Sequence, residues 1–365
     1  MTTQAHAPLV IRSSQGDYGV EFAADLAAAT QTLSTEKEAV IVVDRKVAAL
    51  HAAALGPWLQ SRPHLLVDAT EEFKSLDGVA KVATFLQESG CSKSSTLIAV
   101  GGGIVQDVAA FCAHAYHRGM RWAFLPTTLL AMADSCIGAK CGINLNAFKN
   151  QLGFFYSPAR IVICADFVRT LEPRDVASGH GEILKLAVTG SQAQLDELET
   201  VVARDGLLTP ELGRLIRQSL VVKQGIIEID EHEKDLRRIL NYGHTFGHAL
   251  ETTTNNAVPH GLAVAWGMDL VNELAVRRGV LAKPLADRLH DYIGRYLKPK
   301  VDQKPTAEGL IAAARRDKKA AQGSVNLIFL ETPGKLKIVK SGFDDQLTSD
   351  LTAYLRDRDV SAGLT

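Results

Sequence analysis

The chain has 365 residues, of which 46% are hydrophobic and 22% charged, and its formal net charge is −1. This length exceeds one ordinary core and predicts two domains, while the balanced charge gives no electrostatic basis for binding nucleic acid or a membrane. The chain has no run of eighteen apolar residues and no signal-peptide pattern at its start, so we expect a cytoplasmic protein. None of the five cysteines belongs to a CxxC pair, and we expect reduced core thiols.

Short apolar runs alternate with helical patterns in the first half of the chain. Strands are predicted over residues 39–44, 64–68, 96–100 and 122–126. Helices are predicted between them, over residues 46–59 and about 75–89. Strands that alternate with helices indicate a parallel sheet with right-handed crossovers.

The second half of the chain has a different pattern. Helical periodicity occurs over residues 182–188, 210–228, 236–253, 262–278 and 285–296. A single strand pair is predicted late in the chain, over residues 324–330 and 336–339. We therefore predict an α/β protein with a parallel-sheet domain, residues 1–171, followed by a mostly helical domain, residues 172–365.

Two segments that follow predicted strands are suited to a nucleotide. Gly101, Gly102 and Gly103 stand between a strand and an apolar helix, where glycine lets the backbone approach a pyrophosphate at the helix N-terminus. Thr127 and Thr128 follow the next strand and should lie at the same edge of the sheet. The pattern differs from GxGxxG, the fingerprint of ordinary dinucleotide-binding domains. A tight turn alone would need only one glycine, so three glycines in a row favour a bound ligand.

The segment from residue 134 to residue 153 is rich in glycine and small residues, and we predict a loop. It carries Asp134, Lys140, Lys149 and Asn150. Two ammonium groups, an amide and a carboxylate suit a phosphorylated and hydroxylated substrate. The alternative is a solvated surface loop.

Four polar residues recur at helical spacing later in the chain. Arg237, Asn241, His244 and His248 are separated by four, three and four residues, so one continuous helix would place them on one face. Such a stripe is costly to bury unless it meets a metal, an anion or a substrate. The alternative is a solvated helix face with two incidental histidines.

A third candidate is an acid near the predicted start of a helix. Glu182 and Lys185 lie three residues apart there, where a glutamate ordinarily serves the helix dipole or cap. Glu182 could instead join His244 and His260 in a His₂Glu site with open positions, which is typical of catalytic zinc. His248 lies one turn from His244, and the residues alone do not choose between His248 and His260.

A series of ordered motifs from about Asp44 to Leu330 resembles the dehydroquinate synthase family, the sugar phosphate cyclases. The motifs are GGGIVQD, YHRG, PTTLLAMADSCIGAKCGIN, KNQLGFFYSP, GEILK, RILNYGHTFGHALE, HGLAVAWGM and DKK. The resemblance implies an NAD-binding α/β domain and a helical domain, with the active site between them. It also implies a divalent metal, zinc or cobalt, and a homodimer.

The reaction that the resemblance implies uses NAD without consuming it. The cofactor oxidises a substrate hydroxyl, phosphate is eliminated, the hydride returns, and the opened ring recloses by an aldol step to a carbocycle. The implied metal ligands are Glu182, His244 and His260. The residues implied to bind NAD are Asp44, Glu71, Lys74, Gly102, Gly103, Asp107, Thr127, Thr128 and Lys149.

The resemblance also implies which side chains hold the substrate. Those for its phosphate are Lys140, Asn150, His248 and Lys318 or Lys319, with Arg118 reaching the phosphate of the neighbouring subunit. Those for its hydroxyl groups are Asp134, Lys185 and Asn241. Those for a substrate carboxylate are Lys223 and Arg237.

The favoured substrate is a heptulosonate 7-phosphate, which gives 3-dehydroquinate or a close relative, as in the shikimate pathway. The chain departs from the usual pattern of that enzyme at Gln106, Cys136, Ala139, Cys141, Phe148, Gly181 and Leu262. The segment around Lys140 is closer to secondary-metabolite cyclases that act on sedoheptulose 7-phosphate, yet those usually lose the residues seen here as Arg237, Asn241 and His248. A cyclase that converts sedoheptulose 7-phosphate into a valiolone-type cyclitol is therefore the first alternative function. The others are a metal-dependent polyol dehydrogenase and a non-catalytic binding protein.

Overall fold

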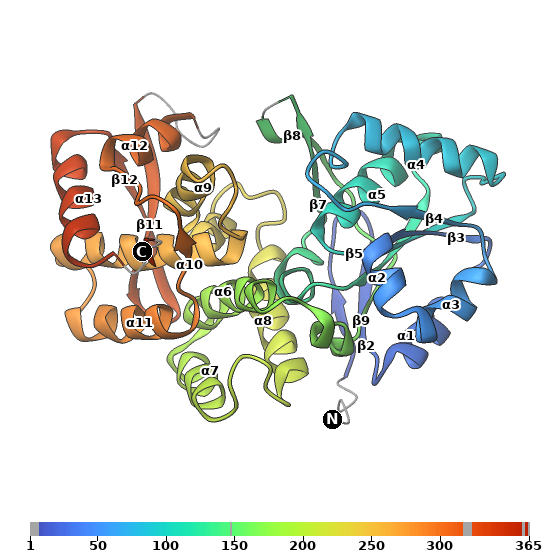
Figure 1. Ribbon diagram of the computed structural model, residues 1–365, viewed down its shortest axis with the longest axis horizontal. Helices are drawn as coiled ribbons and strands as arrows, with labels where there is room; N and C mark the ends of the chain where they lie inside the picture. Colours follow the sequence, from blue (N-terminus) through green and yellow to red (C-terminus); the bar gives the residue numbers. More distant parts are fainter. Residues whose placement is uncertain (1–6, 147, 317–322, 360–361, 364–365) are drawn as a thin grey trace. The chain divides into compact units, whose positions relative to one another are not determined.

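The computed structural model describes residues 7–146, 148–316, 323–359 and 362–363 (Figure 1). The chain forms two compact units. The first comprises Met1–Glu172 and Pro210–His232, and the second comprises Pro173–Thr209 and Glu233–Thr365. The segment 210–232 thus returns to the first unit from the half of the chain that the sequence predicted to be a helical domain.

The first unit is built on a seven-stranded sheet. Its strands in spatial order are β1 (Leu9–Ile11), β2 (Tyr18–Phe22), β9 (Arg160–Ile163), β6 (Arg121–Pro126), β5 (Thr96–Gly101), β3 (Ala39–Asp44) and β4 (His64–Val67). All neighbours pair in parallel except β1 and β2. The predicted parallel sheet and its four strands are confirmed. The sequence did not predict β1, β2 or β9.

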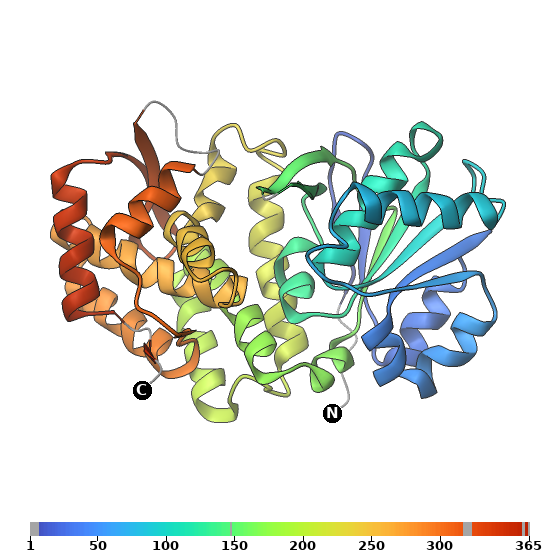
Figure 2. The ribbon, with the colours of Figure 1, turned by 45° about the horizontal axis from the view of Figure 1, so that its top comes forward.

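Helices cover both faces of this sheet. The helices of the first unit are α1 (Leu26–Leu33), α2 (Arg45–Leu50), α3 (Ala52–Gln60), α4 (Leu76–Glu88), α5 (Gly103–Ala115) and α8 (Leu212–Ile227). Figures 1 and 2 show α4 and α5 on one face and α1 and α3 on the other. The apolar runs of β3 and β5 are buried because both faces are covered.

The order of the strands creates a switch point at the centre of the sheet. From β3 the chain moves outward to β4, then crosses back to β5 on the other side of β3 and continues to β6. Connections that leave β3 and β5 in opposite directions open a crevice at their carboxyl ends, where open α/β sheets bind ligands.

The predicted loop over residues 134–153 is wrong. The structure has a π-helical turn, η2 (Ala131–Ser135), and then an antiparallel hairpin, β7 (Lys140–Leu145) and β8 (Phe148–Phe155). Alternate residues of β7, Cys141 and Ile143, are buried. Buried and more exposed side chains alternate along β7, as in a strand with one buried face, and glycines on either side do not prevent this.

The second unit is mostly helical. Its helices are α6 (Pro173–Gly190), α7 (Gln192–Asp205), η4 (Leu236–Asn241), α9 (His244–Thr253), α10 (His260–Arg277), α11 (Lys283–Tyr296), α12 (Ala307–Arg316) and α13 (Asp345–Asp357). Its strands are β10 (Lys300–Val301), β11 (Ser324–Thr332), β12 (Lys335–Gly342) and β13 (Ala362–Gly363), with β11 and β12 forming the predicted hairpin. Helix α10 is central: it is buried continuously from Gly261 to Asn272 and packs against α6, α9 and α11.

All five cysteines are buried and free, as expected. Burial raises the pKa of the Cys112, Cys136 and Cys164 thiols to about 12, so these thiols are protonated and unreactive. Within the part of the chain that the structure describes, none of the helices combines the length and apolar character needed to cross a membrane.

A buried carboxylate ties α10 to two other helices of the second unit. Asp269 accepts a hydrogen bond from the Tyr354 hydroxyl at 2.8 Å and lies 3.0 Å from Nδ1 of His290. Its hydrogen bond raises the pKa of His290 above 6.5, against the opposing effect of burial. The charged pair therefore stabilises the fold below pH 6.5, and this contribution is lost as the pH rises through the higher folded pKa.

This linkage predicts a pH-dependent stability difference. His290→Gln should lower the free energy of unfolding by about 1 kcal/mol at pH 6, and by less at pH 9, because the lost bond is charge-assisted only while His290 is protonated. Denaturant unfolding at the two pH values measures it. His64→Gln, at an exposed histidine, is the control. An equal loss at both pH values would contradict the linkage.

Candidate functional site

Three side chains from three helices converge in the second unit. Glu182 from α6 places Oε1 at 3.8 Å from Nε2 of His244 and at 3.4 Å from Nε2 of His260. The ligand atoms of this trio all lie within 4.8 Å of one another. One carboxylate oxygen and two imidazole nitrogens form a donor set that suits zinc or cobalt.

Both imidazole rings are oriented by a second bond. Nδ1 of His244 lies 3.1 Å from the backbone carbonyl oxygen of Tyr242, and Nδ1 of His260 lies 3.3 Å from the carboxylate of Glu251. With a metal bound, a proton on each Nδ1 would leave the Nε2 lone pair free for the metal. Metal-binding histidines are typically held in this way.

A second trio shares one of these rings. His248, Glu251 and His260 also bring ligand atoms within 4.8 Å of one another. In that trio His260 faces Glu251 through Nδ1, whereas Nε2 faces Glu182. The first trio fits a metal better, because each of its rings has one nitrogen toward the carboxylate and the other on a fixed acceptor.

The charge of the two carboxylates acts on His260. Burial alone would lower its pKa, but hydrogen bonds to Glu182 and Glu251 and their negative charge raise the pKa to about 10. A metal at the first trio would replace this proton, because only the neutral imidazole binds a metal.

The predicted single helical stripe is wrong. Arg237 and Asn241 lie in the short helix η4, which ends before Gly243, and His244 begins α9. Gly243 adopts a left-handed conformation with φ of 79° and breaks the helix there. His244 and His248 remain one turn apart on α9, with ring centroids 5.5 Å apart.

Glu182 is not at the start of a helix, as the sequence suggested. It lies in the middle of α6, which begins at Pro173, and its side chain is 2% exposed. The neighbouring Gly181 does not break this helix but allows a close approach: a Cβ atom there would lie 2.0 Å from the carbonyl oxygen of Gly261 on α10. The cap interpretation of Glu182 therefore fails.

Three more predicted substrate residues lie in the second unit. Lys185, one turn after Glu182, is buried and forms a close ion pair with it. Arg237 is buried at 4% exposure, and Asn241 donates a hydrogen bond to Glu233 at 2.5 Å. A guanidinium presents a planar fork of hydrogen-bond donors that matches a carboxylate, so Arg237 is suited to holding an anion.

The predicted nucleotide residues gather at the carboxyl edge of the sheet in the first unit. Gly102 is the N-cap of α5 and has no side-chain cap, and a Cβ atom there would lie 2.9 Å from the Thr128 side chain. Around Gly103 a Cβ atom would meet nothing within 4 Å. The hydroxyl of Thr127 is buried without a hydrogen-bond partner among the described residues. An open helix N-terminus beside an unpaired buried hydroxyl fits a phosphate-bearing ligand.

Charged residues predicted to contact NAD pair with each other near this edge. Lys74 and Asp107 form an ion pair at 2.6 Å, and Lys149 lies 3.7 Å from Glu71. Asp44 ends β3 and caps α2 by accepting a hydrogen bond from the backbone of Lys46. The switch point thus lies between Asp44 on β3 and the glycines after β5.

Asp134 and Lys223 form a buried pair in the first unit. The ammonium of Lys223 donates to the Asp134 carboxylate and, at 2.7 Å, to its backbone oxygen. Gln106, one of the departures from the family pattern, holds the same turn: its amide donates to the Ser135 carbonyl at 2.7 Å and accepts from the Ser135 hydroxyl at 2.8 Å. The glutamine therefore fixes the π-helical turn that presents Asp134.

The remaining predicted phosphate residues are more exposed. Lys140 begins β7, and Asn150 on β8 has a left-handed φ of 53°. Arg118 is exposed in a turn where His117, Arg118 and Gly119 all have positive φ. Lys318 and Lys319 lie outside the described residues.

Two residues that contact the trio were not predicted from the sequence. Glu251 and Tyr242 orient the rings of His260 and His244. Glu251 follows His244 by seven residues and His248 by three on α9, so helical spacing alone could have indicated it. No local pattern marks Tyr242, because its backbone carbonyl makes the contact.

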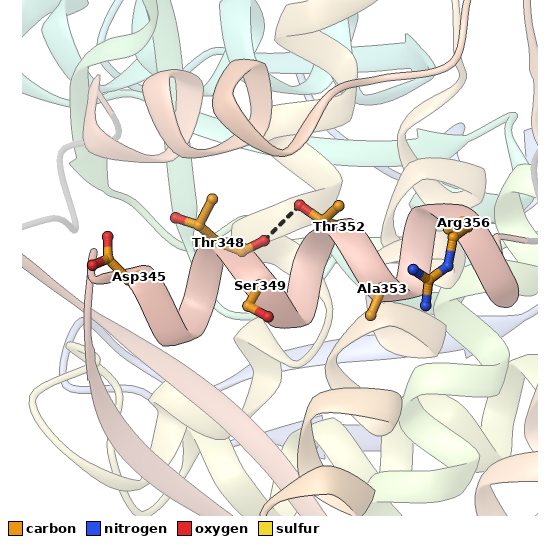
Figure 3. A pocket seen from close by; sticks show the side chains of 6 residues that line it. All are labelled: Asp345, Thr348, Ser349, Thr352, Ala353 and Arg356. Carbon is orange, nitrogen blue, oxygen red and sulfur yellow. Dashed lines mark hydrogen bonds between the residues drawn. The ribbon is translucent and has the colours of Figure 1, made fainter.

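A shallow hollow also lies along α13, and it carries no such chemistry. Figure 3 shows its lining side chains, which all come from this one helix: Asp345, Thr348, Ser349, Thr352, Ala353 and Arg356. The hydroxyl of Thr352 is already bonded to the backbone of Thr348 at 2.8 Å. None of these residues belongs to the predicted site.

Solved structures share this fold along nearly the whole chain. The 2-epi-5-epi-valiolone synthase ValA of Streptomyces hygroscopicus, solved with NAD⁺ and Zn²⁺, is 26% identical with a TM-score of 0.85 and covers 96% of this chain and 100% of its own. A 2-deoxy-scyllo-inosose synthase, solved with carbaglucose-6-phosphate, NAD⁺ and Co²⁺, is 21% identical with a TM-score of 0.83 and the same coverage. The expected fold class is confirmed, because both synthases share it along nearly their whole length.

Family models then identify the chain. The model of the 3-dehydroquinate synthase N-terminal region matches residues 64–178, and that of the C-terminal region matches residues 179–320. The chain belongs to the 3-dehydroquinate synthase family and is a sugar phosphate cyclase of that family.

Curated relatives include two kinds of enzyme. The 3-dehydroquinate synthase of Campylobacter concisus is 35% identical over 82% of this chain and 86% of its own length. The 2-epi-valiolone synthase of Actinosynnema mirum is 33% identical over 92% of this chain and 91% of its own. The expected enzyme class is confirmed, while both substrate expectations stay open.

The geometry predicts which histidine holds a metal. His244→Ala should lose bound zinc or cobalt, because it removes one of three ligands, whereas His248→Ala should retain the metal. Metal analysis after dialysis measures both, and chelation should abolish activity until metal is added back. Metal loss in His248→Ala with retention in His244→Ala would instead favour the trio that contains Glu251.

Proposed function

We propose that this chain is an NAD- and metal-dependent cyclase that converts a heptulosonate 7-phosphate into 3-dehydroquinate or a close relative, with release of phosphate. The observation that carries the proposal is the convergence of Glu182, His244 and His260, with Lys185 paired to the same carboxylate. A glycine-rich helix N-terminus at a sheet switch point supports a nucleotide cofactor.

Each bound group has a defined contribution. When bound, NAD accepts and returns a hydride, and the metal polarises the oxygen atoms of the reacting carbon. Glu182, His244 and His260 would hold the metal. Lys185 and Asn241 would orient substrate hydroxyl groups, and His248 would bind the phosphate that leaves.

A buried arginine supports an acidic substrate. Arg237 presents a planar fork of donors that matches a carboxylate through two parallel hydrogen bonds. Because Arg237 is only 4% exposed, a carboxylate bound to it would be shielded from water and the hydrogen bonds would be weakly screened. In the first unit, Lys223 is held by Asp134, so the two would act on the substrate as a pair.

The second candidate is cyclisation of sedoheptulose 7-phosphate to a valiolone-type product. It is favoured by the 2-epi-valiolone synthase relative and by the residues around Lys140. Cys136, Ala139 and Cys141 are all buried there, so these departures change the packing beneath the hairpin rather than its exposed surface. A polyol dehydrogenase is less well supported, since it has no use for a phosphate set of Lys140, Asn150 and His248.

The active unit that we propose is a homodimer. Arg118 lies exposed in a strained turn, and such turns are retained where they present a functional group. We propose that it reaches the phosphate in the partner's site. Sedimentation of the purified chain measures the assembly, and a monomer at full activity would contradict it.

Recycling of NAD distinguishes the cyclase from a dehydrogenase. With a heptulosonate 7-phosphate and catalytic NAD, released phosphate should far exceed the NAD supplied, and absorbance from NADH should not accumulate. A phosphate assay and absorbance at the NADH band follow both quantities. NADH formed in proportion to product would overturn the cyclase proposal and favour the dehydrogenase.

Arg237→Ala tests the substrate carboxylate. It should reduce turnover of a heptulosonate phosphate by on the order of a hundredfold, about 3 kcal/mol, and leave metal and NAD binding nearly unchanged. Arg238→Ala is the matched control, because the adjacent arginine is exposed. If wild-type protein instead cyclises sedoheptulose 7-phosphate and ignores the heptulosonate, the second candidate is correct.

A further inference from the structure

The turn that precedes the candidate metal ligand His244 is fixed by two contacts to one helix. Tyr242 follows the last residue of η4 and Gly243 precedes the first residue of α9, so these two residues set the position of His244. The carbonyl of Tyr242 lies 3.1 Å from Nδ1 of His244. The position of this carbonyl therefore determines where the imidazole ring points.

The side chain of Tyr242 makes the first contact with α10. Its ring is fully buried, and its hydroxyl donates a hydrogen bond to Oδ1 of Asn272 on α10 at 2.5 Å. Asn272 is itself 1% exposed. A bond between two groups shielded from water is costly to break, because neither group gains solvent in exchange.

The backbone of Gly243 makes the second contact with α10. A Cβ atom at Gly243 would lie 2.5 Å from the carbonyl oxygen of Val264 and 2.6 Å from the Met268 side chain, both on α10. The turn thus lies directly against the helix. Its φ of 79° suits glycine, so neither the contact nor the conformation tolerates a larger residue.

We propose that Tyr242 is a positioning residue for the metal centre, acting through its bond to Asn272 and its carbonyl on His244. Helix α10 begins with the second ligand, His260, and about one to three turns later, from Val264 to Asn272, it holds the turn before the first ligand. One rigid helix therefore sets the spacing of both imidazole rings. This inference rests on the metal site of the proposed function.

Two variants break the anchoring bond from opposite ends. Tyr242→Phe removes the hydroxyl and keeps the ring, and Asn272→Ala removes the acceptor. Each should weaken Zn²⁺ or Co²⁺ binding about tenfold, the lower end of the range for residues that orient a ligand. Chelator competition measures the affinity, and the visible absorption of the Co²⁺-loaded protein should change, because the His244 ring is no longer held in one orientation.

The matched control is Tyr354→Phe. Tyr354 is also fully buried and also donates to α10, but its acceptor is Asp269 rather than the residue that anchors the turn before His244. It should lower the unfolding temperature while leaving metal affinity and the Co²⁺ spectrum as in wild type. Asn272→Ala keeps the proposal testable if Tyr242→Phe fails to fold.

The outcomes separate this inference from the function on which it rests. Loss of metal in His244→Ala, with affinity in Tyr242→Phe and Asn272→Ala equal to that of Tyr354→Phe, would overturn the positioning role alone. Metal affinity unchanged in His244→Ala would overturn the metal site itself, and the positioning role with it. A tenfold loss confined to the two anchoring variants and His244→Ala would support both.

Discussion

The close approach of three helices is the constraint on which the candidate metal site depends. A Cβ atom at Gly181 of α6 would lie 2.0 Å from the backbone of Gly261, and one at Gly267 of α10 would lie 2.0 Å from the carbonyl of Gly243. No side chain fits at these crossings, so the backbones pack directly against each other. Glu182, carried by α6, can meet the two histidines only because the axes come this close.

Burial of charge gives the site its chemistry and would be costly without pairing. Glu182 and Lys185 form one buried pair on α6, and Asp134 and Lys223 form another in the first unit. Isolated charges in such places would lose several kcal/mol of hydration, whereas paired charges keep most of their attraction because water does not screen them. A substrate hydroxyl that enters such a pair meets strong, preoriented partners, which is the condition for electrostatic catalysis.

The candidate nucleotide site depends on a different constraint, the order of the strands. Because β3 and β5 send their connections in opposite directions, the edge between Asp44 and Gly101 is not covered by a crossover. The glycines there open the N-terminus of α5, and the paired charges Lys74 and Asp107 line the approach. The two units thus derive their sites from unrelated features, a sheet edge in one and a set of helix crossings in the other.

The sequence by itself determined the repeating order of strands and helices, since periodicity reports burial directly, and it determined the chemical types at each site. Periodicity predicts strands β3 to β6, and the donor types of Glu182, His244, His248 and His260 indicate a metal site, although spacing leaves the choice between His248 and His260 open. Periodicity missed β1, β2 and β9, and strand length is not the reason, because β2 is longer than the predicted strand β4.

Only the tertiary structure decided how those residue types are used. The spacing of Arg237 to His248 predicted one helix, but Gly243 must turn where it lies against α10, and the stripe is broken. Whether His248 or His260 completes a metal site likewise depends on helix placement, because His260 lies within reach of both Glu182 and Glu251. Contacts between segments distant in sequence set these outcomes, and local spacing carries no information about them, because a backbone crossing involves two helices at once.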